Sequence, residues 1–213
     1  MVAVAVVAVL AALLLPALGA GIQSSEAAQC SANLRTLAAG VLACAAENNG
    51  ALPRSSHSAW AANEKAWSKA ILPYLGEKPD PTNQEWAAIQ KRRFRCPADK
   101  SRRSGQSYGL NVFFELKPDF DEYEGSPQQW RALPSIPAPT RTILLAEVGG
   151  NSDHVMAHFW EGEGSAGYDC AHDRHEGRAN YAFADGHIEL RRLVEIYAPS
   201  QSLNRWNPSL AGK

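Results

Sequence analysis

Apolar residues are distributed so unevenly that the first 22 positions differ in kind from the rest of the chain. Residues 1–22 contain no polar side chain, the first polar residue is Gln23, and the first Lys or Arg is Arg35. At a helical rise of ~1.5 Å per residue such a run covers ~30 Å, which is the thickness of a hydrocarbon core. A buried core helix, a cleavable secretory signal ending in the small residues 18–20 and a permanent membrane stem all fit an apolar run. Because a signal requires positive charge before its apolar stretch and none is present, we expect a transmembrane stem at residues 1–22.

Residues 23–49 are expected to continue the same helix with one apolar face. Between positions 24 and 47 there is no Pro and one Gly, while Ala and Leu are frequent. Apolar or small residues recur at alternating spacings of three and four, which gives a narrow stripe suited to packing against a domain or a second helix. This stripe consists of Ala27, Cys30, Leu34, Leu37, Val41 and Cys44. Asn48-Asn49-Gly50, followed by Pro53, predicts the helix end, so the two segments together would form a rod of ~70 Å.

The remaining residues, 50–213, are expected to form one globular head. Trp60, Trp67, Ile71, Leu72 and Leu75 lie near helical spacing. A second short helix is predicted over residues 82–91, with Thr82 or Asn83 as its N-cap and with Trp86 and Ile89 facing inward. Residues 140–147 form an apolar run that is typical of a buried strand.

Residues 179–190 carry the signature of a β-hairpin around Asp185-Gly186, a pair that suits a type I′ turn. Period-two alternation places Tyr181 and Phe183 on one face of the hairpin, and Ala182 and Ala184 on the other. Small residues on one face allow a helix to approach closely. We therefore predict an α+β fold, in which a long N-terminal helix, membrane-spanning and then amphipathic, packs on a small antiparallel β-sheet head.

Composition and charge narrow the functional classes. The chain has 213 residues, 45% of them hydrophobic, with 21 Lys and Arg against 22 Asp and Glu. The net charge of -1 argues against a nucleic-acid partner, and the basic stretch at 91–103 is expected to be balanced by the acidic stretch at 115–124. Four cysteines without a CxxC pair are too few for a disulfide scaffold. Two alternatives are equally open for the cysteines. Either Cys96 or Cys170 forms a disulfide with Cys30 or Cys44, or all four are buried thiols.

A cluster of His and Asp residues at 169–187 allows a metal-site hypothesis. Its candidate ligands are His172, His175, Asp185 and His187; Asp169, Cys170 and Asp173 lie nearby. Imidazole ligands would suit Zn²⁺, whereas the carboxylates would suit Ca²⁺. The structural alternative makes Asp185 a turn residue and lets His175 bond a backbone carbonyl to fix its loop. Since no Ser-His-Asp order, P-loop or nucleotide-binding glycine fingerprint is present, we expect neither an enzyme nor a resident cofactor.

Several segments resemble one family. His175, nine residues and then Asp185-Gly186 form the pattern of the prepilin-type processing-associated H-X9-DG proteins. Residues 9–18 are similar to the membrane stem of type IV prepilins and of type II secretion pseudopilins. Further similar segments are Cys-Ser-Ala-Asn-Leu-Arg at 30–35, Asn-Asn-Gly at 48–50, Phe-Arg-Cys-Pro-Ala-Asp at 94–99, Ser-Tyr-Gly-Leu-Asn at 107–111, and the residues flanking His175 and Asp185.

This resemblance implies a pilin-like fold and a structural function, with His175, Asp185 and Gly186 as structural motif residues. The chain would be a membrane-anchored pseudopilin-like subunit of a type II secretion or type IV pilus-like assembly, in contact with other pilin or pseudopilin subunits through its N-terminal helix. It would lie in the bacterial inner membrane as a single-pass protein, with its head on the periplasmic or extracellular side.

The family's processing site is a basic leader ending in Gly before an aromatic residue, with a Glu shortly after it. These features are not seen here, so prepilin peptidase would be a partner only where a leader lies upstream. The alternative function is a secreted or membrane-anchored metal-binding, even hydrolytic, domain that uses residues 169–187.

Overall fold

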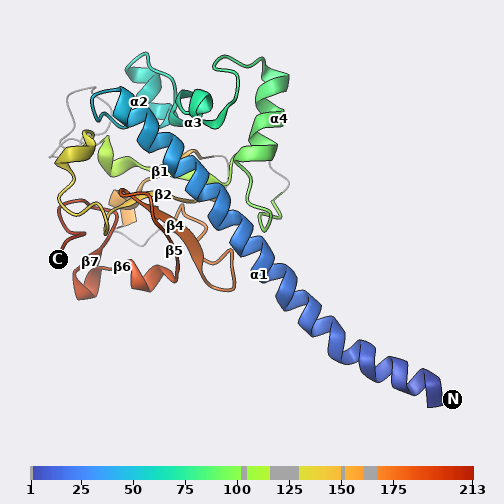
Figure 1. Ribbon diagram of the computed structural model, residues 1–213. Coiled ribbons are helices and arrows are strands. Elements are labelled where there is room, and N and C mark those ends of the chain that lie inside the picture. Colours follow the sequence, from blue (N-terminus) through green and yellow to red (C-terminus); the bar gives the residue numbers. More distant parts are fainter. Residues whose placement is uncertain (1, 102–104, 116–129, 150–151, 161–166) are drawn as a thin grey trace.

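The computed structural model describes residues 2–101, 105–115, 130–149, 152–160 and 167–213, with side chains except at 2–14, 16, 17 and 57. One helix, α1 (Val2–Glu47), dominates its shape. Figure 1 shows that the second half of α1 lies across the head, while the first half extends away from it. The 46 residues of α1 correspond to ~70 Å at the helical rise. A long N-terminal helix on an α+β head is therefore confirmed.

The stripe predicted on the second half of α1 is the face that the head buries. Cys30, Leu34 and Val41 are fully buried, and Leu37 is 1% exposed. The helix ends where its sequence predicts, because Asn49 and Gly50 take positive φ values of 55° and 81° and so turn the chain out of the helix.

The expected single-pass location in the inner membrane requires a correction. No helix within the described residues combines the length and the apolarity that are needed to cross a bilayer. From Gln23 onward α1 carries polar residues, and its apolar stripe is used against the head.

A five-stranded sheet forms the centre of the head, in the order β3-β1-β2-β4-β5. Its strands are β1 (Tyr108–Asn111), β2 (Ile143–Glu147), β3 (His154–Val155), β4 (Ala179–Phe183) and β5 (Ile188–Arg191). Neighbouring strands are antiparallel except for β1 and β3, which run parallel. The sheet is thus mixed, and the prediction of a purely antiparallel sheet was wrong at this edge. The buried strand predicted at 140–147 is β2.

The two faces of the sheet bury different side chains, as the alternation in the hairpin predicts. Ala182 and Ala184 belong to the core that α1 covers. Tyr181 and Phe183 belong to a second core on the opposite face, together with Trp206. The chain segments near this second core include β6 (Tyr197–Ala198) and β7 (Leu203–Asn204), which pair with each other. Small side chains in β4 thus let α1 lie close to the sheet, while large ones fill the far side.

The hairpin at Asp185-Gly186 is confirmed, but its turn is not of type I′. A type I′ turn needs positive φ at both central residues, and of the two only Gly186 has it, at 91°. Residues 184–186 form a three-residue loop, closed by a hydrogen bond of 2.9 Å from the Phe183 N–H to the His187 carbonyl. A left-handed Gly after a turn with ordinary φ is the usual solution for loops of this length.

Short helices surround the far end of α1. They are α2 (Ser56–Ala61), α3 (Trp67–Ala70), the 3-10 helix η1 (Leu72–Leu75) and α4 (Asn83–Arg93). The helical spacing predicted over 60–75 is therefore broken after Ala61, where Asn63 is left-handed with a φ of 54°. Trp67 is fully buried, whereas Trp60 is 86% exposed. Thr82 caps α4 through a capping box with Glu85, as expected. The other 3-10 helices are η2 (Val112–Phe114), η3 (Leu133–Ser135), η4 (Ala157–Trp160), η5 (Leu193–Glu195) and η6 (Pro199–Gln201).

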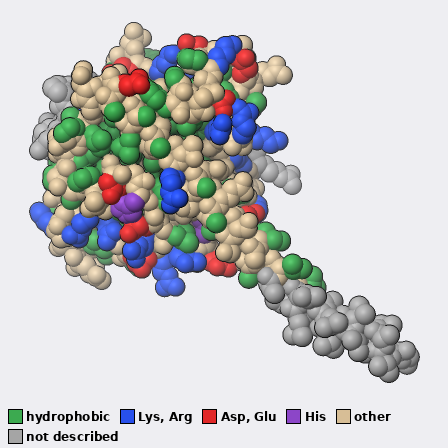
Figure 2. All heavy atoms as spheres, in the orientation of Figure 1, with side chains coloured by type: hydrophobic (Ala, Val, Ile, Leu, Met, Phe, Trp, Pro, Cys, Tyr) green, Lys and Arg blue, Asp and Glu red, His purple; other side chains and the backbone are tan. Residues whose placement is uncertain are grey.

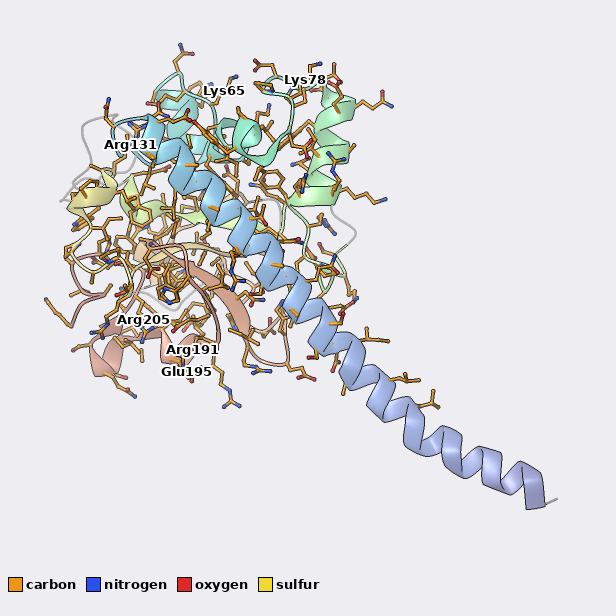
Figure 3. The ribbon with its side chains drawn as sticks, in the orientation of Figure 1. Lys65, Lys78, Arg131, Arg191, Glu195 and Arg205 are labelled. Carbon is orange, nitrogen blue, oxygen red and sulfur yellow. The ribbon has the colours of Figure 1, made fainter. Side chains whose placement is uncertain are left out.

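Charged side chains are dispersed over the head. In the view of Figure 2, Lys and Arg are interspersed with acidic and neutral residues. Figure 3 places Arg131 near the end of α1 and Lys78 beside α4, with Lys65 between them, and Arg191, Glu195 and Arg205 on the opposite side of the head. The expected balance between the basic stretch at 91–103 and the acidic stretch at 115–124 rests largely on residues outside the described ones, so it stays a prediction. Arg92 and Arg93 each lie 2.8 Å from Glu77, and Lys100 lies 2.5 Å from Glu26 of α1. Residues 102–103 and 116–124 lie outside the described residues.

Candidate functional site

Four side chains from distant parts of the sequence meet beneath α1. Cys30 comes from α1, Cys96 follows α4, Glu147 ends β2, and His175 precedes β4. Cys30 and Glu147 are fully buried, and Cys96 and His175 are 2% and 5% exposed. Their sulfur, oxygen and nitrogen atoms all lie within 4.8 Å of one another. We call this group the Glu147 cluster.

Glu147 is the centre of the hydrogen bonds in the Glu147 cluster. Its Oε1 accepts from the Cys30 thiol, lies 2.8 Å from His175 Nε2, and accepts from Asn180 Nδ2 at 3.3 Å. His175 Nε2 also lies 3.6 Å from the Cys96 sulfur. The second carboxylate oxygen, Oε2, is buried and has no hydrogen-bond partner. One oxygen is therefore crowded while the other is unsatisfied.

Local turns place Cys96 and His175. The Asp99 N–H donates to the Cys96 carbonyl at 3.0 Å, so the chain folds back directly after the cysteine. His175 precedes two left-handed residues, Glu176 and Gly177, with φ values of 56° and 77°. Its own N–H donates to the Arg178 carbonyl at 2.8 Å. The tight turn aims the imidazole back under α1 just before β4 begins.

Burial and hydrogen bonding shift the pKa values in the cluster in opposite directions. Burial raises the pKa of Cys30 far above its usual range, and the nearby Cys96 and Glu147 add to this shift. The hydrogen bond with Cys30, and a second with His175, lower the pKa of Cys96 to about 6 against the effect of burial. Burial by itself would lower the pKa of His175, but its bonds to Cys96 and Glu147 raise it to about 9. The contact between Cys96 and His175 thus lowers the pKa of the thiol and raises that of the imidazole.

The arrangement does not form a nucleophilic relay. In a thiol or serine relay, the histidine contacts its nucleophile through one ring nitrogen and its orienting carboxylate through the other. Here Cys96 and Glu147 both contact Nε2 of His175. The four ligand atoms instead lie within 4.8 Å of one another, close enough to be shared by one ion. Two thiols, an imidazole and a carboxylate are the ligand types of Zn²⁺ sites.

Of the four metal ligands predicted from the sequence, only His175 joins the cluster. His172 lies with its ring 5.4 Å from that of Tyr168 in an edge-on contact. His187 stacks on Phe183 with ring centres 4.4 Å apart, and its Nδ1 lies 2.6 Å from Asp185. The structure therefore does not bring His172, His175, Asp185 and His187 together, because the hairpin holds Asp185 and His187 in the turn while His175 joins Glu147 under α1.

The nearby Asp169 carboxylate forms structural hydrogen bonds away from the Glu147 cluster. Its carboxylate accepts from the Met156 N–H at 2.7 Å and from Trp160 Nε1 at 3.0 Å, which fixes the segment around η4. The turn interpretation of Asp185 is confirmed, since its Oδ1 accepts from the His187 N–H at 3.1 Å. The companion idea that the His175 ring bonds a backbone carbonyl was wrong, because the ring contacts the Glu147 carboxylate.

The sequence prediction missed Cys30, Cys96 and Glu147 as partners of His175. A signal was present for two of them, because Cys30 and Cys96 lie in two of the segments, 30–35 and 94–99, on which the expected family resemblance was based. Tyr108, from a third such segment, places its hydroxyl 3.2 Å from the Cys30 sulfur. Residues from segments 30–35, 94–99 and 107–111 therefore meet His175 around one buried carboxylate. Among the described residues all four cysteines are free and buried.

A groove gives solvent a route to the edge of the cluster. It has a volume of about 460 Å³ and lies between the start of the embedded half of α1 and the β4–β5 hairpin. Gln23, Ala27, Asn180, Ile188 and His175 are among its lining residues. A small ion can thus approach the cluster from the side of His175.

A second buried carboxylate, Glu115, lies outside the Glu147 cluster. It accepts from the Ser55 N–H, and from the Ser55 hydroxyl at 2.8 Å. Burial raises the pKa of Glu115 to about 7, although the Ser55 bonds and the nearby His154 oppose the shift. Next to it, Asp153 accepts from the N–H and the hydroxyl of Ser56 at 2.8 and 2.7 Å.

A comparison of the chain with protein families, with curated proteins and with solved structures finds no match.

Proposed function

We propose that the chain is a structural subunit, similar to pseudopilins, that assembles with further copies of itself through the first half of α1. In this proposal the helix on the sheet is a pilin-like arrangement, and the head is displayed rather than used for catalysis. The observation that carries the proposal is the part of α1 that extends beyond the head in Figure 1.

The described side chains of this extension are apolar and exposed. Leu15, Leu18 and Ile22 are 69%, 60% and 59% exposed. A side-chain carbon added at Gly19 or Gly21 would meet nothing within 4 Å. Burying one leucine or isoleucine contributes ~1.5–3 kcal/mol, so a row of them on a helix favours a partner.

The composition of the extension supports a second copy as that partner. Residues 1–22 consist of Met, Val, Ala, Leu, Pro, Gly and Ile, with no charge that would select a partner of opposite sign. Such a surface is complementary to itself, and its small residues allow helix axes to approach closely. Segment similarity to the stems of prepilins at residues 9–18 points the same way.

The test compares two Glu substitutions on the same helix in the full chain. Leu18 lies on the extension and is 60% exposed, whereas Ala39 is an exposed residue on the embedded half. We expect the unmodified chain and Ala39→Glu to sediment as multi-subunit assemblies, and Leu18→Glu to sediment as a monomer. Analytical ultracentrifugation over a range of concentrations measures this. A monomeric unmodified chain, or equal assembly of both variants, would contradict the proposal.

A further inference from the structure

We propose that the Glu147 cluster is a binding site for one Zn²⁺ ion, with Cys30, Cys96, Glu147 and His175 as its ligands. The site would lie in the head and does not depend on assembly through α1. Its effect would be structural, because it would join α1, the segment after α4, the central strand β2 and the approach to β4.

The ligand types identify the class of metal. Two cysteine sulfurs with one imidazole and one carboxylate form a borderline-soft set, which suits Zn²⁺. Ca²⁺ and Mg²⁺ require oxygen ligands, and the cluster offers a carboxylate from Glu147 alone. Four ligands are also the number that structural zinc sites use.

One pair of ligand atoms already has the spacing of a tetrahedral zinc site, whereas Glu147 Oε1 lies closer to His175 Nε2 and to the Cys30 sulfur than two ligands of one ion would. With Zn–S near 2.3 Å and Zn–N near 2.05 Å, a tetrahedral angle separates sulfur and nitrogen by ~3.6 Å. The Cys96 sulfur lies 3.6 Å from His175 Nε2. The hydrogen bond of 2.8 Å between His175 and Glu147 would be replaced by bonds from each to the ion.

The unsatisfied oxygen of Glu147 is an independent sign of a missing ligand. Glu147 is fully buried, and its Oε2 has no hydrogen-bond partner. Among the described residues, its one ion-pair partner is His175, which meets the other oxygen. A buried polar atom without a partner costs ~1–3 kcal/mol, so native proteins rarely retain one. A cation bound to the carboxylate would remove this cost.

The surroundings supply the outer contacts that metal ligands usually have. Asn180 Nδ2 donates to Glu147 Oε1 at 3.3 Å, and it also reaches the Ala27 carbonyl of α1 at 3.4 Å. The Tyr108 hydroxyl lies 3.2 Å from the Cys30 sulfur, where it can donate to a thiolate. Such outer contacts orient ligands and typically change metal affinity by ~10–100-fold.

The experiment titrates the reduced full chain with Zn²⁺ and, separately, with Co²⁺ as a spectroscopic probe. We expect one Zn²⁺ per chain by elemental analysis, a thermal unfolding midpoint that rises with Zn²⁺ and falls with chelator, and Co²⁺ spectra with thiolate charge-transfer bands of a tetrahedral site. Cys96→Ser should lower the Zn²⁺ affinity at least ~10-fold.

Two variants serve as matched controls for loss of folding. Cys44→Ser and Cys170→Ser each remove another buried free cysteine that lies outside the cluster. Both should bind Zn²⁺ as the unmodified chain does, with circular dichroism used to verify that all variants are folded. The proposal is overturned if the folded, reduced chain binds no Zn²⁺, if Cys96→Ser binds it unchanged, or if mass mapping of the native protein shows a Cys30–Cys96 disulfide.

Discussion

Glu147 and Glu115 are both buried carboxylates of the head, but the chain satisfies them in different ways. Glu115 faces a matched pair of donors, the N–H and the hydroxyl of Ser55, and each oxygen receives one bond. Glu147 has three contacts on one oxygen and none on the other. Both residues are at most 2% exposed, so the difference does not come from unequal exposure to bulk solvent.

The neighbours of the two carboxylates differ in chemistry as well. Glu115 lies among hydroxyl and backbone groups, which complete a hydrogen-bond network without further help. Glu147 lies among two sulfurs and an imidazole, which are poor mutual hydrogen-bond partners but good ligands of one metal ion. The comparison teaches that a buried acid with a complete set of donors is a structural anchor, whereas one among soft ligands with a free oxygen marks a binding site.

The largest effect is expected from His175→Ala in the presence of chelator. This change removes the one ion-pair partner of Glu147 among the described residues and leaves the carboxylate buried. Breaking a buried pair in this way costs about 3–5 kcal/mol of unfolding free energy. Denaturant unfolding monitored by circular dichroism measures it.

His187→Ala is the matched control for that substitution. The His187 side chain is 39% exposed and loses mainly its stacking on Phe183, so its removal should cost about 0.5–1.5 kcal/mol of unfolding free energy, well below the cost at His175. Equal losses for the two variants would show that the Glu147 cluster is no more coupled to stability than the surface is.

A smaller effect is expected from Glu115→Gln, and it should depend on pH. The pKa of Glu115 is raised from 4.5 to about 7, so between these pH values the folded chain keeps a proton that the unfolded chain releases. The contribution of this residue to stability is therefore present below pH 4.5 and is lost as the pH rises through about 7, by up to about 3 kcal/mol. Gln cannot ionise, and it keeps an acceptor for Ser55. Burial lowers the pKa of the neighbouring His154, but its hydrogen bond to Asp153 outweighs this and raises it, so the variant must be compared with the unmodified chain at each pH.

We expect Glu115→Gln to gain stability relative to the unmodified chain between pH 5 and pH 8, as measured by denaturant unfolding at each pH. Glu176→Gln is the control, because its carboxylate is 59% exposed. A constant difference between Glu115→Gln and the unmodified chain across this range would mean that Glu115 is not held protonated by burial.

Much of the fold could be predicted from the sequence where the determinant is local. The stripe on α1 follows from spacings of three and four, and the structure buries Cys30, Leu34 and Val41 as that spacing requires. The opposite faces of Ala182 and Phe183 follow from the two-residue period of a strand. These patterns depend only on the geometry of one element.

The Glu147 cluster and the parallel pairing of β1 and β3 could not be predicted in this way, because both depend on which surfaces meet. Cys30 and Glu147 are separated by 117 positions, and Cys96 and His175 by 79. No periodicity encodes such distances. A single Glu at the end of an apolar strand gives no local sign that its carboxylate will be buried among thiols.

The smallest effect on stability is expected from Gly186→Ala, at the second end of the H-X9-DG pattern. Gly186 lies in the hairpin turn, whereas His175, at the first end, lies in the Glu147 cluster. Gly186 has a φ of 91°, and a side-chain carbon there would lie 3.1 Å from Leu42 of α1. Gly186→Ala should therefore cost about 1 kcal/mol of unfolding free energy through backbone strain, measured by denaturant unfolding. It should leave Zn²⁺ binding unchanged, since the turn contributes no ligand to the Glu147 cluster. If Gly186→Ala lowered Zn²⁺ affinity as much as Cys96→Ser does, the turn and the cluster would form one coupled unit, and the separation drawn between the two ends of the pattern would be wrong.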